Sequence, residues 1–202
     1  GVDSKYAVQS VNFTTDSADD SNGHGTSVAK AILSESNGEA LILSIKAMHD
    51  SGTGYLSDVL QGLEYAKSQN ADFVNLSIAA EDLGGTEIFK QEVKTLVDSG
   101  IKVVASAGNF SQNSKNYIPA NIEGVESIGA YYTDESSNKF IQKSSNYNAT
   151  YYEEASSTSI AAAIHTGKLV RGETEFVKES DLNGIKDDLS ENPSYTLPIL
   201  SK

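Results

Sequence analysis

The sequence contains no cysteine among its 202 residues. The chain therefore has no disulfide framework, no thiolate nucleophile and no zinc site of the cysteine type. It also has no apolar run that approaches the ~18 residues of a membrane-spanning helix, so we expect no insertion into a membrane. No signal peptide is visible, and the first residue is Gly1 rather than Met.

Positive charge is also scarce. Lys and Arg together number 15 against 28 Asp and Glu, which gives a net charge of −13. No basic cluster interrupts this acidic background, and an acidic surface is poorly suited to binding phosphate backbones. We therefore expect no nucleic-acid partner. The length suits one domain with a full hydrophobic core.

Apolar and amphipathic stretches alternate between residues 40 and 106. Three nearly continuous apolar runs predict strands that are covered on both faces: 40–48, 73–78 and 101–106. Apolar residues at helical spacing predict intervening helices over 55–69 and 86–98. This alternation indicates right-handed crossovers, and hence an α/β protein with a three-layer α/β/α arrangement around a mostly parallel sheet. In such sheets the chemistry lies at the carboxyl ends of the strands.

Further elements are expected on either side of this core. The pattern predicts strands at 6–13 and 124–131, an edge strand at 139–142, and helices at 24–34 and 156–169. Thr26 or Ser27 is expected to cap the first of these two helices.

Three polar motifs stand at the ends of predicted elements, and together they suit acyl transfer. His24 lies between two glycines before a helix, Asn109 follows a strand, and Ser159 opens a helix. Serine chemistry needs a base for the hydroxyl and preorganised donors for the oxyanion. His24 is the candidate base, Ser159 the nucleophile and Asn109 a side-chain oxyanion donor. Each residue alone also fits an ordinary turn or helix cap.

These motifs, in this order, resemble those of the subtilisin-like serine proteases, the subtilases. Residues 22–26 (NGHGT) are similar to the family's histidine motif, 107–109 (AGN) to its oxyanion-hole motif, and 158–161 (TSIA) to its nucleophile motif. The resemblance covers about residues 1–170. It implies a subtilisin-like peptidase domain there, with residues 171–202 as a charged C-terminal tail of the same domain.

The resemblance implies a serine endopeptidase that hydrolyses peptide bonds through an acyl-enzyme at Ser159. A peptide or protein would be the substrate, a propeptide or upstream segment could bind as a partner, and no cofactor or metal ion is expected. An extended substrate would pair with the edge at Gly54. The remaining substrate-binding residues would wall the primary pocket: Ser77, Ile78, Ala79, Ser106, Ala107 and Gly108. The family also implies an extracellular or cell-surface bacterial protein.

The family's catalytic aspartate is missing from its usual place. It precedes the histidine in an Asp-Ser/Thr-Gly motif, and residues 1–4 (GVDS) read best as the sequence that follows it. We therefore expect the aspartate upstream of Gly1, on a central strand that the chain lacks. Asp3 is the alternative.

Other departures weaken the match around the nucleophile. Ser157 and Ala163 stand where the family has Gly and Pro, and its usual strand is not recognisable between residues 146 and 156. The segment 34–40 is too short for the family's calcium-binding loop. A second interpretation therefore stays open: a catalytically impaired pseudoprotease that binds peptides or a protein partner.

Overall fold

A mostly parallel sheet forms the centre of the protein. The computed structural model describes residues 2–185 and the backbone of 199–200. The main sheet has the strand order β10-β8-β6-β4, all parallel, and β9 pairs antiparallel with β8. Its strands are β4 (Phe73–Leu76), β6 (Lys102–Ser106), β8 (Glu126–Thr133), β9 (Lys139–Ile141) and β10 (Tyr151–Glu154).

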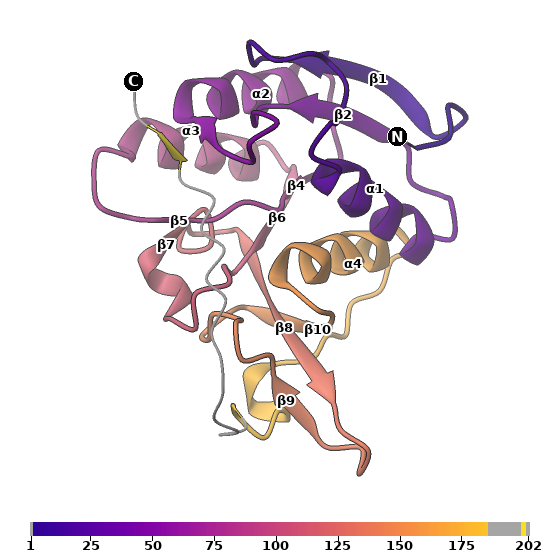
Figure 1. Cartoon of the computed structure of the whole chain (residues 1–202), viewed down its shortest axis with the longest axis vertical. Helices are drawn as coiled ribbons and strands as arrows, with labels where there is room; N and C mark the ends of the chain where they lie inside the picture. Colours follow the sequence, from indigo (N-terminus) through magenta and orange to yellow (C-terminus); the bar gives the residue numbers. More distant parts are fainter. Residues whose placement is uncertain (1, 186–198, 201–202) are drawn as a thin grey trace.

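Helices cover both faces of this sheet, as Figure 1 shows. The helices are α1 (His24–Glu35), α2 (Leu56–Ser68), α3 (Glu87–Asp98) and α4 (Thr158–Val170). Successive strand residues point to opposite faces. Val103 of β6 packs in one cluster with residues of α2 and α3, whereas its neighbour Val104 packs with Ala161 and Ala162 of α4. This confirms the three-layer α/β/α fold.

Helix α1 lies beside α4 on the same side of the sheet (Figure 1). Val28 and Ile32 of α1 share a buried cluster with Ala163 of α4. The two helices approach closely at Gly167, where a β-carbon would lie 2.5 Å from the Glu35 Cβ and 2.7 Å from the Ile32 carbonyl oxygen. Glycine is therefore needed at this position for the helices to pack.

A second, two-stranded sheet stands apart from the main one. It consists of β1 (Ala7–Asn12) and β2 (Ile42–Lys46), which pair in parallel. Ile45 of β2 packs in the same hydrophobic cluster as Val74 of β4. No ladder joins β2 to β4 within the described residues. Each of these two strands therefore keeps one edge without a strand partner there.

Some predicted elements differ from those observed. The run 40–48 forms a strand only at Ile42–Lys46, where Ser44 is exposed and the other side chains are half-buried, so full coverage of both faces was wrong for this strand. The sequence showed no strand between residues 146 and 156, yet β10 lies there as a parallel neighbour of β8. Its residues, Tyr-Tyr-Glu-Glu, lack an apolar pattern.

Short elements complete the chain. They are β3 (Gly54–Tyr55), β5 (Ala80–Glu81), β7 (Tyr117–Ile118), β11 (Ile199–Leu200) and 3-10 turns at Ser114–Asn116 and Glu179–Asp181. β11 pairs in parallel with β3, and β5 pairs antiparallel with β7. In the expected tail, 171–202, Val177 bridges Tyr152, while 186–198 and 201–202 lie outside the described residues. No helix in the described part is long and apolar enough to span a membrane.

Candidate active site

The predicted nucleophile lies in the first turn of α4 and is tied to the end of β4. The Ser77 hydroxyl donates to the Ser159 carbonyl oxygen over 2.9 Å. In return, the Ser159 hydroxyl makes only a long contact, 3.4 Å, to the Ser77 carbonyl oxygen. The Asn75 amide supports Ser77 by donating to its hydroxyl over 2.9 Å. The Ser159 backbone is therefore fixed, while its half-buried hydroxyl is only weakly engaged.

Asn109 follows β6 and contacts the residue before Ser159. Its Oδ1 atom accepts hydrogen bonds from the backbone N–H and the hydroxyl of Thr158, both over 3.0 Å. These two donors fix the orientation of the amide, so its NH₂ group points away from Thr158. The Nδ2 atom has no acceptor among the described residues and can donate to another group.

His24 is the first residue of α1 and follows a glycine in the left-handed conformation. Gly23 has φ 84°, which a residue with a β-carbon adopts only with strain. Gly23 is the N-cap residue, and the carboxylate of Asp20 accepts from the backbone N–H groups of Gly23 and Thr26 over 2.9 and 2.7 Å. The expectation that Thr26 or Ser27 caps the helix was wrong, because side chains before the helix accept from its first N–H groups instead: Asp20 from Thr26 and Asn22 from His24.

The environment of His24 favours its neutral form. Burial lowers the pKa of His24 below its ordinary value, and the nearby Asp20 carboxylate offsets this only in part. No carboxylate within the described part of the chain binds the imidazole, since both oxygens of Asp20 accept from the α1 end. The ring is thus available as a proton acceptor but lacks an orienting acceptor of its own.

The packing of α1 against α4 places His24 and Ser159 at the same height along the axes of these two helices. Ile32 lies eight residues after His24, and its contact Gly167 lies eight residues after Ser159. Ala163 lies one turn before Gly167, and it clusters with Ile32 and with Val28, which lies one turn before Ile32. The two helices therefore run in the same direction. With an equal rise of ~1.5 Å per residue, both helices begin at the same end of the pair.

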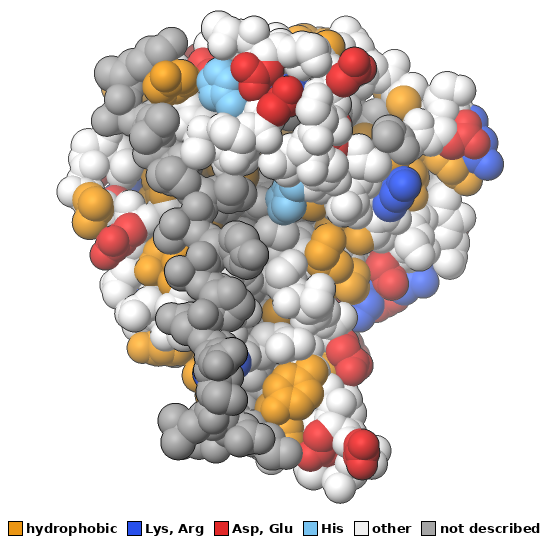
Figure 2. Space-filling view, in the orientation of Figure 1, with side chains coloured by type: hydrophobic (Ala, Val, Ile, Leu, Met, Phe, Trp, Pro, Cys, Tyr) orange, Lys and Arg blue, Asp and Glu red, His pale blue; other side chains and the backbone are white. Residues whose placement is uncertain are grey.

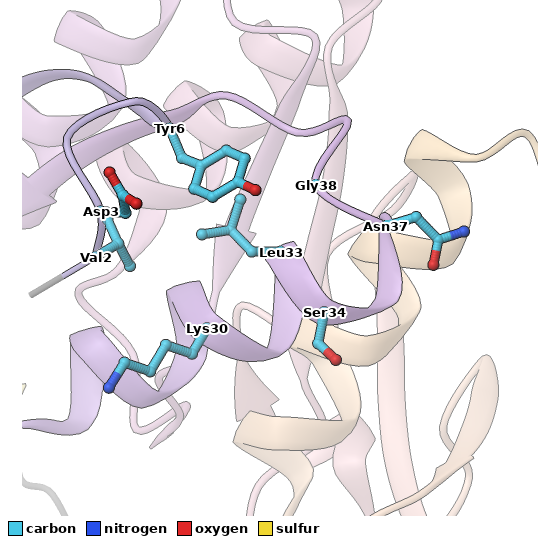
Figure 3. Close-up of a pocket in the computed structure, with 8 residues that line it drawn as sticks. All are labelled: Val2, Asp3, Tyr6, Lys30, Leu33, Ser34, Asn37 and Gly38. Carbon is cyan, nitrogen blue, oxygen red and sulfur yellow. The ribbon is translucent and has the colours of Figure 1, made fainter.

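Asp3, the alternative aspartate, lies elsewhere. It lines a pocket beside Lys30 and Leu33 in the second half of α1, as Figure 3 shows. Its carboxylate accepts from the Lys5 backbone N–H over 3.1 Å and lies 3.9 Å from the Lys5 ammonium. Lys30 is six residues after His24, about 9 Å along the helix axis. The structure does not bring Asp3 to the His24 imidazole.

The predicted pocket residues lie at the ends of two neighbouring strands: 77–79 follow β4, and 106–108 begin with the last residue of β6. The Ser106 hydroxyl donates to the Ile78 carbonyl oxygen over 3.0 Å, which joins the two segments. Ala79 follows directly, half-buried, before β5. Gly54 lies apart from them in β3, where it pairs with Ile199 of β11.

Asn146 is a site residue that the sequence did not reveal. This fully buried side chain donates to the Ala107 carbonyl oxygen over 2.8 Å and accepts from the backbone N–H groups of Phe110 and Gln112, both over 3.0 Å. It thereby shapes the loop that carries Asn109. A β-carbon at Gly108, with φ 103°, would lie 2.5 Å from the Asn146 Nδ2 atom. An isolated Asn in a polar segment gives no sequence signal for this role.

The surface agrees with the acidic composition. Figure 2 shows Asp and Glu side chains at the upper edge and on the lower lobe of this face, while the described Lys and Arg side chains on it form no continuous patch. Two histidine side chains are visible there, in agreement with the partial exposure of His24 and His49 and the burial of His165.

Comparisons with known proteins give a consistent result. A model of the Subtilase family matches residues 3–174. A subtilisin-like serine protease of Sarocladium strictum is 36% identical over 131 residues, which cover 61% of this chain and 34% of the relative. Subtilisin Savinase of Lederbergia lenta is 33% identical over 131 residues, covering 61% of this chain and 47% of the relative.

One relative matches more of the chain. A subtilisin-like protease of Coccidioides posadasii is 29% identical over 180 residues, covering 84% of this chain and 44% of the relative. The crystal structure of a cold-adapted subtilisin-like serine proteinase superposes with a TM-score of 0.70 and 24% identity, over 83% of this chain and 67% of that one. The chain spans from a quarter to less than half of the first curated relatives. Fungal and bacterial relatives both occur, so the expected bacterial origin is not supported.

Proposed function

Because the chain belongs to the subtilase family, we propose that it forms part of a serine endopeptidase with Ser159 as nucleophile, His24 as general base and Asn109 in the oxyanion hole. The observation that carries this assignment is the packing of α1 against α4 at Gly167, which brings the helix ends bearing His24 and Ser159 to one level. The bond from Thr158 to Asn109 adds the third group at the same end.

The reaction proceeds in two halves. The His24 imidazole takes the proton from the Ser159 hydroxyl as its oxygen attacks the carbonyl carbon of the substrate. The oxyanion that forms accepts hydrogen bonds from the Asn109 Nδ2 amide and from the N–H groups at the start of α4. His24 then gives its proton to the leaving amine. Water attacks the acyl-enzyme in the second half, with the same base, and releases the free acid.

The substrate lies extended in this proposal. Its backbone pairs near Gly54 and along residues 77–79, as an added strand. The pairing of β11 with β3 supports the idea that this edge accepts extended chain. The pocket walls at 77–79 and 106–108 carry small or apolar side chains, so an uncharged, hydrophobic residue is preferred there. As for its relatives of the subtilisin type, we place the substrate and the protein outside the cell.

We further propose that the carboxylate that orients His24 comes from a strand that inserts between β2 and β4. Both strands have a free edge in the described structure, and both pack in the same apolar cluster under α2. A parallel strand in this gap would satisfy both edges and join the two sheets into one. Its carboxyl end would lie with those of β4 and β6, near His24.

A fluorophosphonate probe tests the nucleophile, because it reacts with an activated serine. We expect labelling at Ser159, mapped by mass spectrometry, in a chain extended upstream through an Asp-Ser/Thr-Gly strand. Ser159→Ala should abolish the label and His24→Ala should suppress it. Ser156→Ala, which removes an exposed hydroxyl of the same segment, is the matched control and should label normally. A folded extended chain that takes no label yet binds peptides would favour the pseudoprotease.

The inserted strand is tested by comparing the extended chain with residues 1–202. We expect the short chain to be only marginally stable and inactive or nearly so. Loss of the aspartate alone costs subtilisin about 3 × 10⁴-fold in turnover. Loss of its whole strand also exposes two sheet edges. Thermal melts and peptide hydrolysis measure both effects. Equal stability and equal activity of the two chains would refute the insertion.

A further inference from the structure

The imidazole of His165 lies in a fully buried position between two carboxylates. Its side chain is 0% exposed, in the third turn of α4. The Nδ1 atom lies 3.1 Å from a carboxylate oxygen of Glu153, and the Nε2 atom lies 3.0 Å from one of Glu126. Both ring nitrogens therefore face an acceptor.

With both carboxylates ionised, this arrangement requires a proton on each ring nitrogen. A neutral imidazole has one N–H donor and one lone pair, whereas an ionised carboxylate can only accept. With either neutral tautomer, a ring lone pair would face a carboxylate oxygen at about 3 Å inside the protein. The imidazolium instead donates to both Glu126 and Glu153, and hydrogen bonds between charged partners are the stronger kind.

The two carboxylates are held in turn by lysines on their outer sides. The Lys102 ammonium lies 2.9 Å from Glu126, and the Lys168 ammonium lies 2.7 Å from Glu153. The charged groups thus form one chain, Lys102–Glu126–His165–Glu153–Lys168, in which each negative group lies between two positive ones.

Two aromatic rings keep water away from the imidazole. The Tyr151 ring stacks on His165 with centroids 5.3 Å apart, and the Phe176 ring lies 4.0 Å away. Tyr151 lies in β10, two residues before Glu153, and Phe176 lies in the segment that follows α4. A bond between charges in such an enclosed site is stronger than the same bond in water.

We propose that His165, as an imidazolium, is a positioning residue that ties α4 to β8 and β10 and thereby holds Ser159, six residues earlier, in place. The tie to the sheet is a property of the fold, whereas the consequence for Ser159 chemistry rests on the proposed function.

The polar contacts that Thr158 and Thr166 of α4 make reach β4 and the segment after β6. His165 provides the contact to β8 and β10. Thr158 binds Asn109 after β6, and the Thr166 hydroxyl donates to the Asn75 amide oxygen of β4 over 3.1 Å. On its inner face α4 carries small residues, Ala161 and Ala162, whose side chains bury little apolar surface. The charged bridge is therefore the polar link from α4 to β8 and β10 in the described structure.

The bridge also sets the pH range in which it acts. Burial lowers the pKa of His165, but the hydrogen bonds to Glu126 and Glu153 outweigh burial and raise the pKa above its ordinary value of 6.5. A raised pKa in the folded state contributes stability that is complete below the unfolded value and is lost as the pH rises through the folded value. In that window the folded-to-unfolded ratio falls by up to tenfold per pH unit.

Nitrogen-15 NMR of histidine-labelled protein tests the protonation directly. The chain has three histidines, so substitution of His24 and His49 one at a time assigns the ring signals. We expect His165 to show two protonated ring nitrogens at pH 7 and to titrate above 6.5. A single neutral tautomer at pH 7 would overturn the proposal.

Variants test the consequence for stability. In the extended chain, urea unfolding of His165→Gln should show no fall of the folded-to-unfolded ratio above pH 6.5. His165→Lys, which keeps a charge in this range, should restore stability there. His49→Gln is the matched control and should keep the fall. If both variants at His165 fail to fold, the NMR titration of the wild-type chain still decides the proposal.

The effect of His165 on Ser159 is tested by fluorophosphonate labelling of the extended chain. We expect the labelling rate to decline at alkaline pH in the wild type and to stay level in His165→Lys. An unchanged decline in that variant would refute the positioning role. Absence of labelling at every pH would refute the proposed function instead, while the NMR and unfolding results would still decide the protonated bridge.

Discussion

Replacement of Asn146 by alanine should destabilise the protein more than any ordinary polar substitution. The side chain is fully buried and makes three hydrogen bonds, to the Ala107 carbonyl oxygen and from the backbone N–H groups of Phe110 and Gln112. Each such bond contributes about 1 kcal/mol net, and a buried partner left without a bond costs about 1–3 kcal/mol.

The three groups differ in how well water can replace the lost bonds. The Ala107 residue is buried, whereas Gln112 is exposed and Phe110 half-exposed. We therefore count about 2 kcal/mol for the carbonyl and about 1 kcal/mol for each amide, or about 4 kcal/mol in all. For a domain of this size, that lowers the melting temperature by about 8–16 °C.

Urea unfolding and thermal melts of the extended chain measure the effect. Asn116→Ala is the matched control, because Asn116 is exposed in the same region, and it should change the unfolding free energy by less than about 0.5 kcal/mol. The Asn146 variant should also slow fluorophosphonate labelling of the extended chain, since the loop that carries Asn109 loses its support. A destabilisation below about 1 kcal/mol would refute this reasoning.

Three further predictions concern other parts of the molecule. Gly167→Ala should destabilise by about 1–3 kcal/mol in urea unfolding, because the added carbon forces α1 from α4; a stabilisation, as alanine gives in an unobstructed helix, would contradict this packing. The His24 imidazole of residues 1–202 should titrate below pH 6.5 by NMR, because burial lowers the pKa of His24; a midpoint above 6.5 would disagree. The hydrogen bond from Lys90 lowers the pKa of Asp82 to about 2, so Asp82→Asn should destabilise at pH 7, and its deficit should shrink as the pH falls from 3.8 toward 2, whereas a constant deficit would exclude the charge as its cause.

Much of the fold could be predicted because its signals are local. Continuous apolar runs identified β4 and β6, and helical periodicity identified α2, α3 and α4 within a few residues. β10 could not be predicted because its residues do not alternate between apolar and polar: Tyr152 and Glu153 are both buried, and Glu153 binds His165 and Lys168 of α4. A pairing between residues far apart in the chain cannot be predicted from the pattern of a short sequence segment.

In the candidate site, too, residues in short motifs could be predicted, whereas residues that depend on long-range contacts could not. His24, Asn109 and Ser159 stood out because each lies in a short motif, and the motifs occur in a recognisable order. Asn146 and the support of Ser159 by Ser77 could not be found in this way, since each depends on contacts across more than thirty residues. The gap between β2 and β4 likewise appears only once the ladders are known.

The extended chain is proposed to hydrolyse peptide bonds with Ser159 as the nucleophile. The most direct measurement is hydrolysis of an internally quenched peptide with a hydrophobic residue before the scissile bond, by the extended chain and by its Ser159→Ala variant. We expect cleavage by the first and a loss of about 10⁶-fold in the second, as in subtilisin. Equal cleavage by both, or no cleavage by an extended chain that melts cooperatively, would contradict the account.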